Sequence, residues 1–169
     1  GTGTGAGIVV RGQVLNGANA IGGEWGHNPL PWPTDEERPG PSCFCGKQGC
    51  METFVSGPGM QRDYQRHTGT ALRAQDIVSR AEQGEAAATA CLQRYEDRLA
   101  RGLAHVINII DPDVIVLGGG MGNIQRLYER VPAIWGRYIF SDQVVTRLVP
   151  PRFGDSSGVR GAAWLWNHE

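Results

Sequence analysis

Three cysteines and one histidine near the start of the chain have the types and spacing of metal ligands. Cys43, Cys45 and Cys50 lie close together, and His27 precedes them. Thiolates and an imidazole are the donors that a tetrahedral zinc ion prefers, and two glycines between the last two cysteines let the chain turn. A site closed by four protein ligands leaves no position for an activated water. The pattern therefore predicts a structural zinc site.

Other roles for the cysteines are buried free thiols or disulfide bonds. A bridge between Cys43 and Cys45 would be cramped, because one residue separates them. Cys91 falls on a helical pattern, where a buried structural thiol is expected. The remaining histidines, at positions 67, 105 and 168, are remote from the cysteines in sequence. His27 is therefore the predicted fourth ligand.

Two carboxylates flank these ligands. Glu24 stands three residues before His27, and Glu52 stands two residues after Cys50. A carboxylate accepts two hydrogen bonds and suits the hydroxyl groups of a sugar. Most glutamates in loops are merely solvated, so it is the convergence of these two on one loop that favours a binding role.

Two glycine-rich segments could contact a phosphate or a nucleotide through the backbone. The run Gly1-Thr2-Gly3-Thr4-Gly5-Ala6-Gly7 offers N–H groups and threonine hydroxyls to phosphate oxygens. It lacks the lysine of a P-loop and does not open a helix. The run Gly118-Gly119-Gly120 follows a predicted strand, where ligands lie in open α/β sheets. The alternatives are a flexible hairpin turn and tight helix–sheet packing.

Composition narrows the class of protein. The chain has 169 residues, 40% of them hydrophobic, enough for one core or one lobe of a larger protein. A net charge of -1 argues against nucleic-acid or anionic-membrane partners and favours a small molecule. The sequence shows neither an apolar run long enough for a membrane span nor a secretion signal. We therefore expect a cytoplasmic location, where cysteines serve as ligands rather than disulfides.

Helices and strands are predicted to alternate, which is typical of an α/β layer domain. The long segment 85–110 places apolar residues three or four apart and predicts a helix, whereas 16–42 is too rich in Gly and Pro for regular structure. Residues 113–117 predict a buried strand. Further predictions are a hairpin over 8–10 and 13–15, helices over 58–66 with Ser56 as cap, 75–81, 123–135 and 159–166, and a strand over 144–149.

Taken together, these motifs resemble the ROK family of bacterial sugar kinases and sugar-responsive repressors. The resemblance lies in Gly3–Gly5, Gly23–His27, Cys43–Glu52, Asp111–Gly120 and Gly154–Ala163, in that order. It implies an actin-like ATPase (ribonuclease H-like) sugar kinase fold, with residues 1–169 as its carboxyl-terminal lobe. A zinc and sugar loop would span about residues 22–56, and the amino-terminal lobe would be absent from the chain.

The resemblance also implies an activity, because residues 26–32 and 45–50 look most like the fructokinase (manno-fructokinase) branch of the family. The full-length protein would phosphorylate a hexose with ATP and Mg²⁺, most readily fructose. Mannose or glucose would rank second and N-acetylglucosamine third. The catalytic Asp would lie in the other half, so this chain alone would be inactive. A ROK repressor is the rival interpretation, and a zinc-stabilised interaction module is the third.

Residue roles follow from the same resemblance. Glu24, His27 and Glu52 would bind the hexose, and His27, Cys43, Cys45 and Cys50 would bind structural zinc. Gly3, Thr4 and Gly5 would contact phosphate, and Gly119 and Gly120 would let adenosine lie against the backbone. ROK proteins commonly dimerise, so a homodimer is expected.

Overall fold

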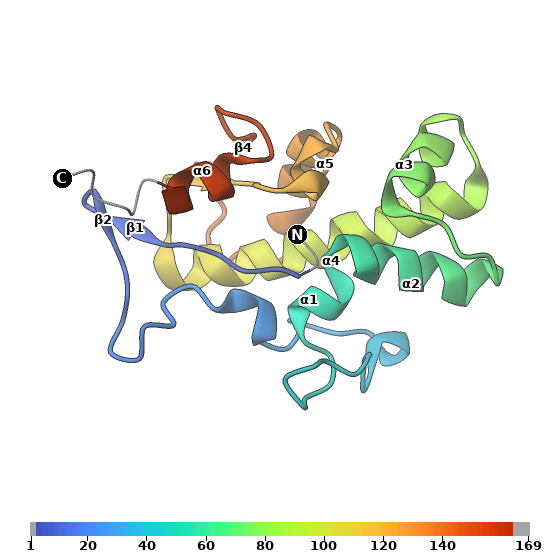
Figure 1. The fold of residues 1–169 in the computed structure, drawn as a ribbon, viewed down its shortest axis with the longest axis horizontal. Coiled ribbons are helices and arrows are strands. Elements are labelled where there is room, and N and C mark those ends of the chain that lie inside the picture. The colour runs from blue at the N-terminus through green and yellow to red at the C-terminus, as the bar shows by residue number, and fades with distance from the viewer. Residues whose placement is uncertain (1–2, 164–169) are drawn as a thin grey trace. The chain divides into compact units, whose positions relative to one another are not determined.

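The computed structural model describes residues 3–163, and their contacts divide the chain into two compact units. Among the described residues, the amino-terminal unit comprises residues 3–98, and the carboxyl-terminal unit comprises residues 99–163. The division falls within the long helix α4 (Ala86–Ile110) (Figure 1). Each unit is described by itself.

The amino-terminal unit begins with the predicted hairpin. Strands β1 (Val9–Val10) and β2 (Gln13–Val14) pair antiparallel, with Val9 opposite Val14. Arg11 and Gly12 turn the chain with positive φ values of 52° and 78°, which is the backbone of the tight turns that match strand twist. The hairpin is confirmed, although each strand is one residue shorter than predicted.

The segment after the hairpin contains two short 3-10 turns, η1 (Trp25–His27) and η2 (Asp35–Glu37). It folds back on the cysteine-rich stretch through isolated bridges, Pro29 with Cys50 and Ser42 with Gln48. As predicted, the segment carries no extended helix or ladder among its residues. Further backbone hydrogen bonds join it to the same stretch: Leu30 N–H donates to Gly49 O, and Gly49 N–H donates to Pro41 O, each at 3.0 Å.

Three helices follow, α1 (Met51–Phe54), α2 (Gly57–Thr68) and α3 (Ala74–Glu82). The predicted helices 58–66 and 75–81 are confirmed as α2 and α3, whereas α1 was not predicted. Ser56 caps α2 as expected, because its Oγ accepts the Gly59 N–H at 3.0 Å. A change to Ala would leave that donor without this partner.

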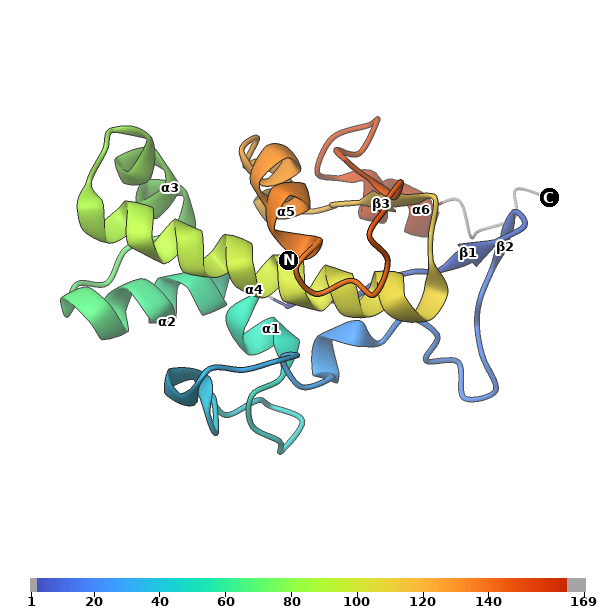
Figure 2. The ribbon, with the colours of Figure 1, turned by 180° about the vertical axis from the view of Figure 1, so that it is seen from behind.

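Helix α4 confirms the predicted long helix, and its apolar stripe is largely buried. Leu92, Tyr95, Leu99 and Leu103 are each less than 5% exposed, whereas Ile110 at the helix end is 37% exposed. Helix α2 lies alongside the first half of α4 in both views (Figures 1 and 2). Each fully buried Leu or Met of this kind contributes about 2 kcal/mol. No described helix is long and apolar enough to cross a membrane.

The carboxyl-terminal unit contains a parallel pair of strands, β3 (Val114–Val116) and β4 (Arg147–Val149), with Ile115 opposite Leu148. Besides the second half of α4, its helical elements are the 3-10 turn η3 (Gly120–Asn123) and the helices α5 (Leu127–Trp135) and α6 (Ser157–Ala163). Alternating strands and helices agree with the predicted α/β class.

Four details of this unit differ from the prediction. The helix predicted from residue 123 begins at Leu127, because glycines hold the preceding residues in η3 and Ile124 is extended. The strand predicted over 144–149 covers only 147–149. The terminal helix begins at Ser157 rather than 159, and its predicted residues 164–166 lie outside the described residues.

The fourth difference concerns burial. The strand predicted to be buried exposes Val114 by 41% and Val116 by 53%. Within the described residues β3 pairs only with β4. Side chains alternate between the two faces of a strand, so Val114 and Val116 share one exposed face while Ile115, on the other, is half-buried. The predicted burial is therefore wrong for the two valines.

Candidate functional site

The structure brings all four predicted metal ligands together. The donor atoms of His27, Cys43, Cys45 and Cys50 lie within 4.8 Å of one another. The Cys45 and Cys50 sulfurs are 3.7 Å apart, and Cys43 Sγ is 3.5 Å from His27 Nδ1. Zinc bonds of about 2.3 Å to sulfur and 2.0 Å to nitrogen place tetrahedral ligands about 3.8 Å (S–S) and 3.5 Å (S–N) apart. These two separations therefore match those of a tetrahedral site.

Backbone bonds of the loop position these ligands. Cys43 N–H donates to Lys47 O at 2.8 Å, and Gly46 N–H donates to Cys43 O at 3.1 Å. Gly46 and Gly49 have φ values of 85° and 71°, which side-chain-bearing residues rarely adopt. The chain thus curls into a knuckle that turns two thiols inward. The Pro29–Cys50 bridge then brings the third thiol towards His27, at the end of η1.

The three thiols differ in their electrostatic surroundings. A backbone hydrogen bond from Lys47 lowers the pKa of Cys45 to about 7, whereas burial raises the pKa of Cys50 to about 12. The pKa of Cys43 is also raised: its bond to the Cys45 backbone favours the thiolate, but burial and the Cys45 and Glu52 side chains outweigh it. Three adjacent thiolates repel one another, and a bound divalent cation removes that repulsion.

The two predicted sugar-binding carboxylates have different environments. Glu52 lies at the start of α1, where its Oε1 is 3.3 Å from Cys43 Sγ and 4.0 Å from His27 Nδ1. Glu24 is solvent-exposed just before η1, and its backbone carbonyl accepts from Asn28 Nδ2 at 3.4 Å. The structure therefore places the Glu52 carboxylate next to two of the predicted metal ligands. Glu24 is next to η1, which carries His27, and contacts Asn28 through its backbone carbonyl.

Phe44 is a neighbour of the site that the sequence analysis missed. Its ring stands edge-on to the His27 ring, with centroids 4.9 Å apart, and the side chain is 85% exposed. The signal was its position between Cys43 and Cys45, because a knuckle that turns both cysteines inward must turn the intervening residue outward. An exposed aromatic ring thus borders the imidazole.

The first glycine segment packs against α1 and against residues 25–50, from η1 to Cys50, which we call the metal loop. The Thr4 hydroxyl donates to Val55 O, at the end of α1. A Cβ at Gly3 would lie 2.5 Å from Glu52 Oε2, and a Cβ at Gly26 would overlap Thr4 O. Because the Thr4 hydroxyl proton is bound to a carbonyl, the phosphate contact that we predict for Thr4 falls to its backbone N–H. Around Gly5, no described atom lies within 4 Å of an added Cβ.

The second glycine segment follows β3. Gly119 has φ 76° and ψ 179°, a region that is essentially open only to glycine. Gly118 and Gly120 are exposed, and no described atom lies within 4 Å of a Cβ added at either. The carboxyl ends of β3 and β4 meet at one edge because the strands are parallel. Across that edge, Asn123 Nδ2 donates to Asp155 Oδ2 at 3.3 Å.

Comparisons with known proteins agree with this fold. The ROK family profile matches residues 1–169. The chain is 37% identical to the N-acetyl-D-glucosamine kinase of Vibrio cholerae serotype O1, over 98% of this chain and 56% of that protein. The chain therefore belongs to the ROK family, and the predicted family is confirmed.

Two solved structures of the family share the fold. The ROK hexokinase from Thermus thermophilus is 30% identical with a TM-score of 0.81, over 96% of this chain and 53% of that chain. A ROK family transcriptional regulator is 28% identical with a TM-score of 0.77, over 96% of this chain and 42% of that one. The chain spans about half the length of the curated relatives it matches, and it corresponds to the carboxyl-terminal half of a ROK kinase.

Proposed function

We propose that the chain forms part of an ATP-dependent hexose kinase, to which it contributes a zinc-stapled sugar loop and part of the nucleotide site. The observation that carries the proposal is the grouping of His27, Cys43, Cys45 and Cys50, whose donor atoms lie within 4.8 Å of one another, with the Glu52 carboxylate beside them. Three sulfur donors and one imidazole favour zinc. Four protein ligands give the ion a structural role.

His27 would serve both the metal and the sugar. Its Nδ1 faces the thiols, 3.5 Å from Cys43 Sγ, so a metal ligand at Nδ1 fixes the tautomer that carries a proton on Nε2. That N–H can donate to a sugar hydroxyl, while Glu52 and the exposed Glu24 accept from others. The bound hexose would thus be oriented by two acceptors and one donor, with Phe44 beside the imidazole.

Nucleotide binding would use backbone rather than side chains. The N–H groups of Gly3, Thr4 and Gly5 would contact phosphate, and the open surface at Gly119 and Gly120 would take the adenosine. ATP would bring Mg²⁺ on its phosphates, as is usual for such sites. The base that takes the proton of the attacking hydroxyl is a further requirement. The resemblance assigns that Asp to the other half of a kinase, so we expect this chain alone to be inactive.

The curated relatives bear on the choice of sugar. The predicted preference for fructose has no support from the curated relatives, several of which are N-acetyl-D-glucosamine kinases at 36–37% identity. We therefore place N-acetyl-D-glucosamine first and keep fructose, mannose and glucose as alternatives. Initial rates with each sugar and ATP on the full-length protein distinguish them. Equal rates with every sugar would show that no single hexose defines the enzyme.

A sugar-responsive transcriptional regulator is the second candidate, because a regulator of this family shares the fold at 28% identity. Such a protein would keep the metal loop and the sugar pocket. ATP turnover separates the two candidates: a kinase forms ADP from ATP when hexose is added, whereas a regulator binds hexose without turnover. A coupled assay for ADP release by the full-length protein gives the answer, and turnover by residues 1–169 alone would contradict the expected inactivity.

We also propose that the protein forms a homodimer. The support is its family membership, and the alternative to test is assembly through the metal loop itself. Light scattering with and without a chelator measures the mass in each condition. A dimer that survives metal removal assembles through another surface.

A further inference from the structure

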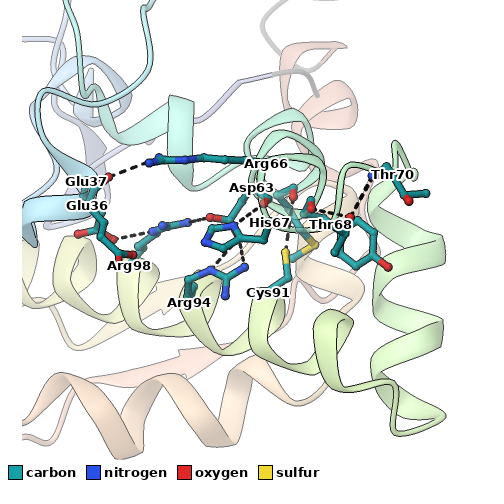
Figure 3. A network of polar contacts seen from close by, with 12 residues as sticks. Glu36, Glu37, Asp63, Arg66, His67, Thr68, Thr70, Cys91, Arg94 and Arg98 are labelled. Atoms are coloured by element: carbon teal, nitrogen blue, oxygen red, sulfur yellow. Dashed lines mark hydrogen bonds and ion pairs between the residues drawn. The ribbon is translucent and has the colours of Figure 1, made fainter.

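Arg98, which no sequence motif singled out, lies at the centre of a buried ionic network (Figure 3). Its Nε donates to Glu37 Oε1 at 2.7 Å, and its Nη1 donates to Asp63 Oδ1 at 2.8 Å. Arg98 and Glu37 are both 7% exposed. Arg94, one turn earlier on α4, donates to Asp63 Oδ2 through Nε and Nη2. The guanidinium of Arg98 thus joins two acidic residues from different segments.

Charges removed from water in this way must be matched. Burial alone would raise the pKa of Asp63, but hydrogen bonds and the charges of Arg94 and Arg98 outweigh it and lower that pKa. Asp63 therefore stays ionised. Removing one partner of such a network leaves a buried charge without compensation, which is strongly unfavourable. The network thus fixes the positions of the segments that carry Glu37, Asp63 and Arg98.

One of those segments is the metal loop. Glu37 ends η2, and its second oxygen, Oε2, accepts the Thr34 N–H at 2.9 Å. Two residues beyond Arg38, Gly40 packs so closely on Gly49 that a Cβ there would lie 2.5 Å from Gly49 Cα. Gly49 immediately precedes the metal ligand Cys50, and its N–H donates to Pro41 O at 3.0 Å. The chain just after the η2 turn, which Glu37 links to Arg98, therefore packs against the stretch that carries the predicted metal ligand Cys50.

A second segment is α1, which carries Glu52. The Arg98 guanidinium lies over the Phe54 ring, 5.1 Å from its centroid. Phe54 is two residues from Glu52 on the same short helix. A cation over an aromatic face is attracted to it, more strongly where water is excluded. Arg98 thus contacts the η2 turn, which lies between His27 and the three cysteines, and the helix that follows Cys50.

We propose that Arg98 is a positioning residue that clamps the η2 turn to α1, and thereby holds the metal ligands and Glu52 in the arrangement that binds zinc and hexose. The inference rests on the proposed function. Arg98 touches neither the metal donors nor the substrate in this role. Its effect passes through Glu37 and Phe54.

Two variants on one helix face test the clamp. Arg98→Met removes the bonds to Glu37 and Asp63, whereas Arg94→Met removes an ion pair with the same Asp63 but keeps the bond from Arg98 to Glu37. Zinc release from the zinc-loaded chain is timed with a chromophoric chelator, and thermal unfolding is recorded for each variant. We expect zinc release to be about 10-fold faster in R98M, the lower end of the effect seen when residues that orient metal ligands are lost. The rate in R94M should stay close to that of the unsubstituted chain.

If Arg98 only stabilised the fold, the zinc release rate and the thermal stability would change together. Equal release rates in the two variants, or rates that follow their thermal stability alone, would therefore overturn the proposal. If R98M does not fold, Glu37→Gln takes its place, since Gln keeps the bond to Thr34 and loses the ion pair. Its release rate is judged by the same criterion. An unsubstituted chain that holds no zinc contradicts the proposed function itself. An unsubstituted chain that holds zinc, with unchanged release in E37Q, contradicts only the clamp.

Discussion

The metal loop and the glycine turn after β3 are built on opposite principles. In the loop, side chains would do the binding: four donor atoms lie within 4.8 Å, and a buried ion pair holds the η2 turn. In the turn, the absence of side chains leaves space, since no described atom lies within 4 Å of a Cβ added at Gly118 or Gly120. The first site should therefore fail when atoms are removed, and the second when atoms are added.

Loss of a metal ligand should have the largest effect. In Cys50→Ser the ion loses a buried thiolate, and in the smallest zinc domains metal binding supplies about 10 kcal/mol of folding free energy. We expect the zinc content to fall from one per chain to near zero, and the thermal midpoint to fall with it. Metal analysis and thermal unfolding with and without chelator measure both. Cys91→Ala, a buried cysteine away from the cluster, should keep its zinc.

Breaking the buried network should come next. Asp63→Asn removes the negative charge between Arg94 and Arg98, and removal of one member of a buried ion pair costs about 3–5 kcal/mol. Urea unfolding measures the loss. A cost close to zero would show that solvent reaches the network, so that the contrast between the two regions would be overstated.

The same carboxylate predicts a pH dependence. Because the pKa of Asp63 is lower in the folded state, the folded chain binds fewer protons than the unfolded chain at acid pH. The contribution of the Asp63 carboxylate to stability is complete above its unfolded pKa of about 3.9 and is lost as the pH falls below that value. Unfolding free energies measured from pH 6 downward should show this slope in the native chain and a smaller slope in D63N. Identical slopes would contradict it.

Addition of a methyl group in the glycine turn should have a smaller effect. Gly119→Ala places a Cβ at φ 76° and ψ 179°, a strain of about 1–3 kcal/mol. Gly120→Ala, at the next position, should leave stability unchanged and serves as the matched control. A larger residue there, as in Gly120→Leu, should weaken nucleotide binding by the full-length protein without lowering its thermal midpoint. Unchanged binding would place the adenosine elsewhere.

The smallest effect is expected at the surface. Arg73 and Asp76 form an exposed ion pair at 3.0 Å, and such pairs contribute little. Asp76→Asn should therefore leave the thermal midpoint unchanged within error, in contrast to D63N. A marked fall in the midpoint would show that this exposed ion pair stabilises the fold as the buried network does.

Local patterns predicted much of this molecule. The stripe of Leu92, Tyr95 and Leu99 predicted the long helix, and the spacing of Cys43, Cys45 and Cys50 indicated the cluster of thiols. Both patterns succeed because residues so close in sequence are brought together by short-range geometry alone. The pairing of Arg98 with Glu37 spans 61 positions, and no local pattern in a single sequence reveals such a contact. The exposure of Val114 also escaped prediction, since a β-branched run indicates a strand but not how many neighbours cover it.

The central claim is that the loop folds around a zinc ion held by three sulfurs and one nitrogen. X-ray absorption at the zinc edge of the purified chain tests it most directly. We predict one zinc per chain with three sulfur neighbours at about 2.3 Å and one nitrogen at about 2.0 Å. A chain without zinc, or an ion surrounded mainly by oxygen, would contradict the account.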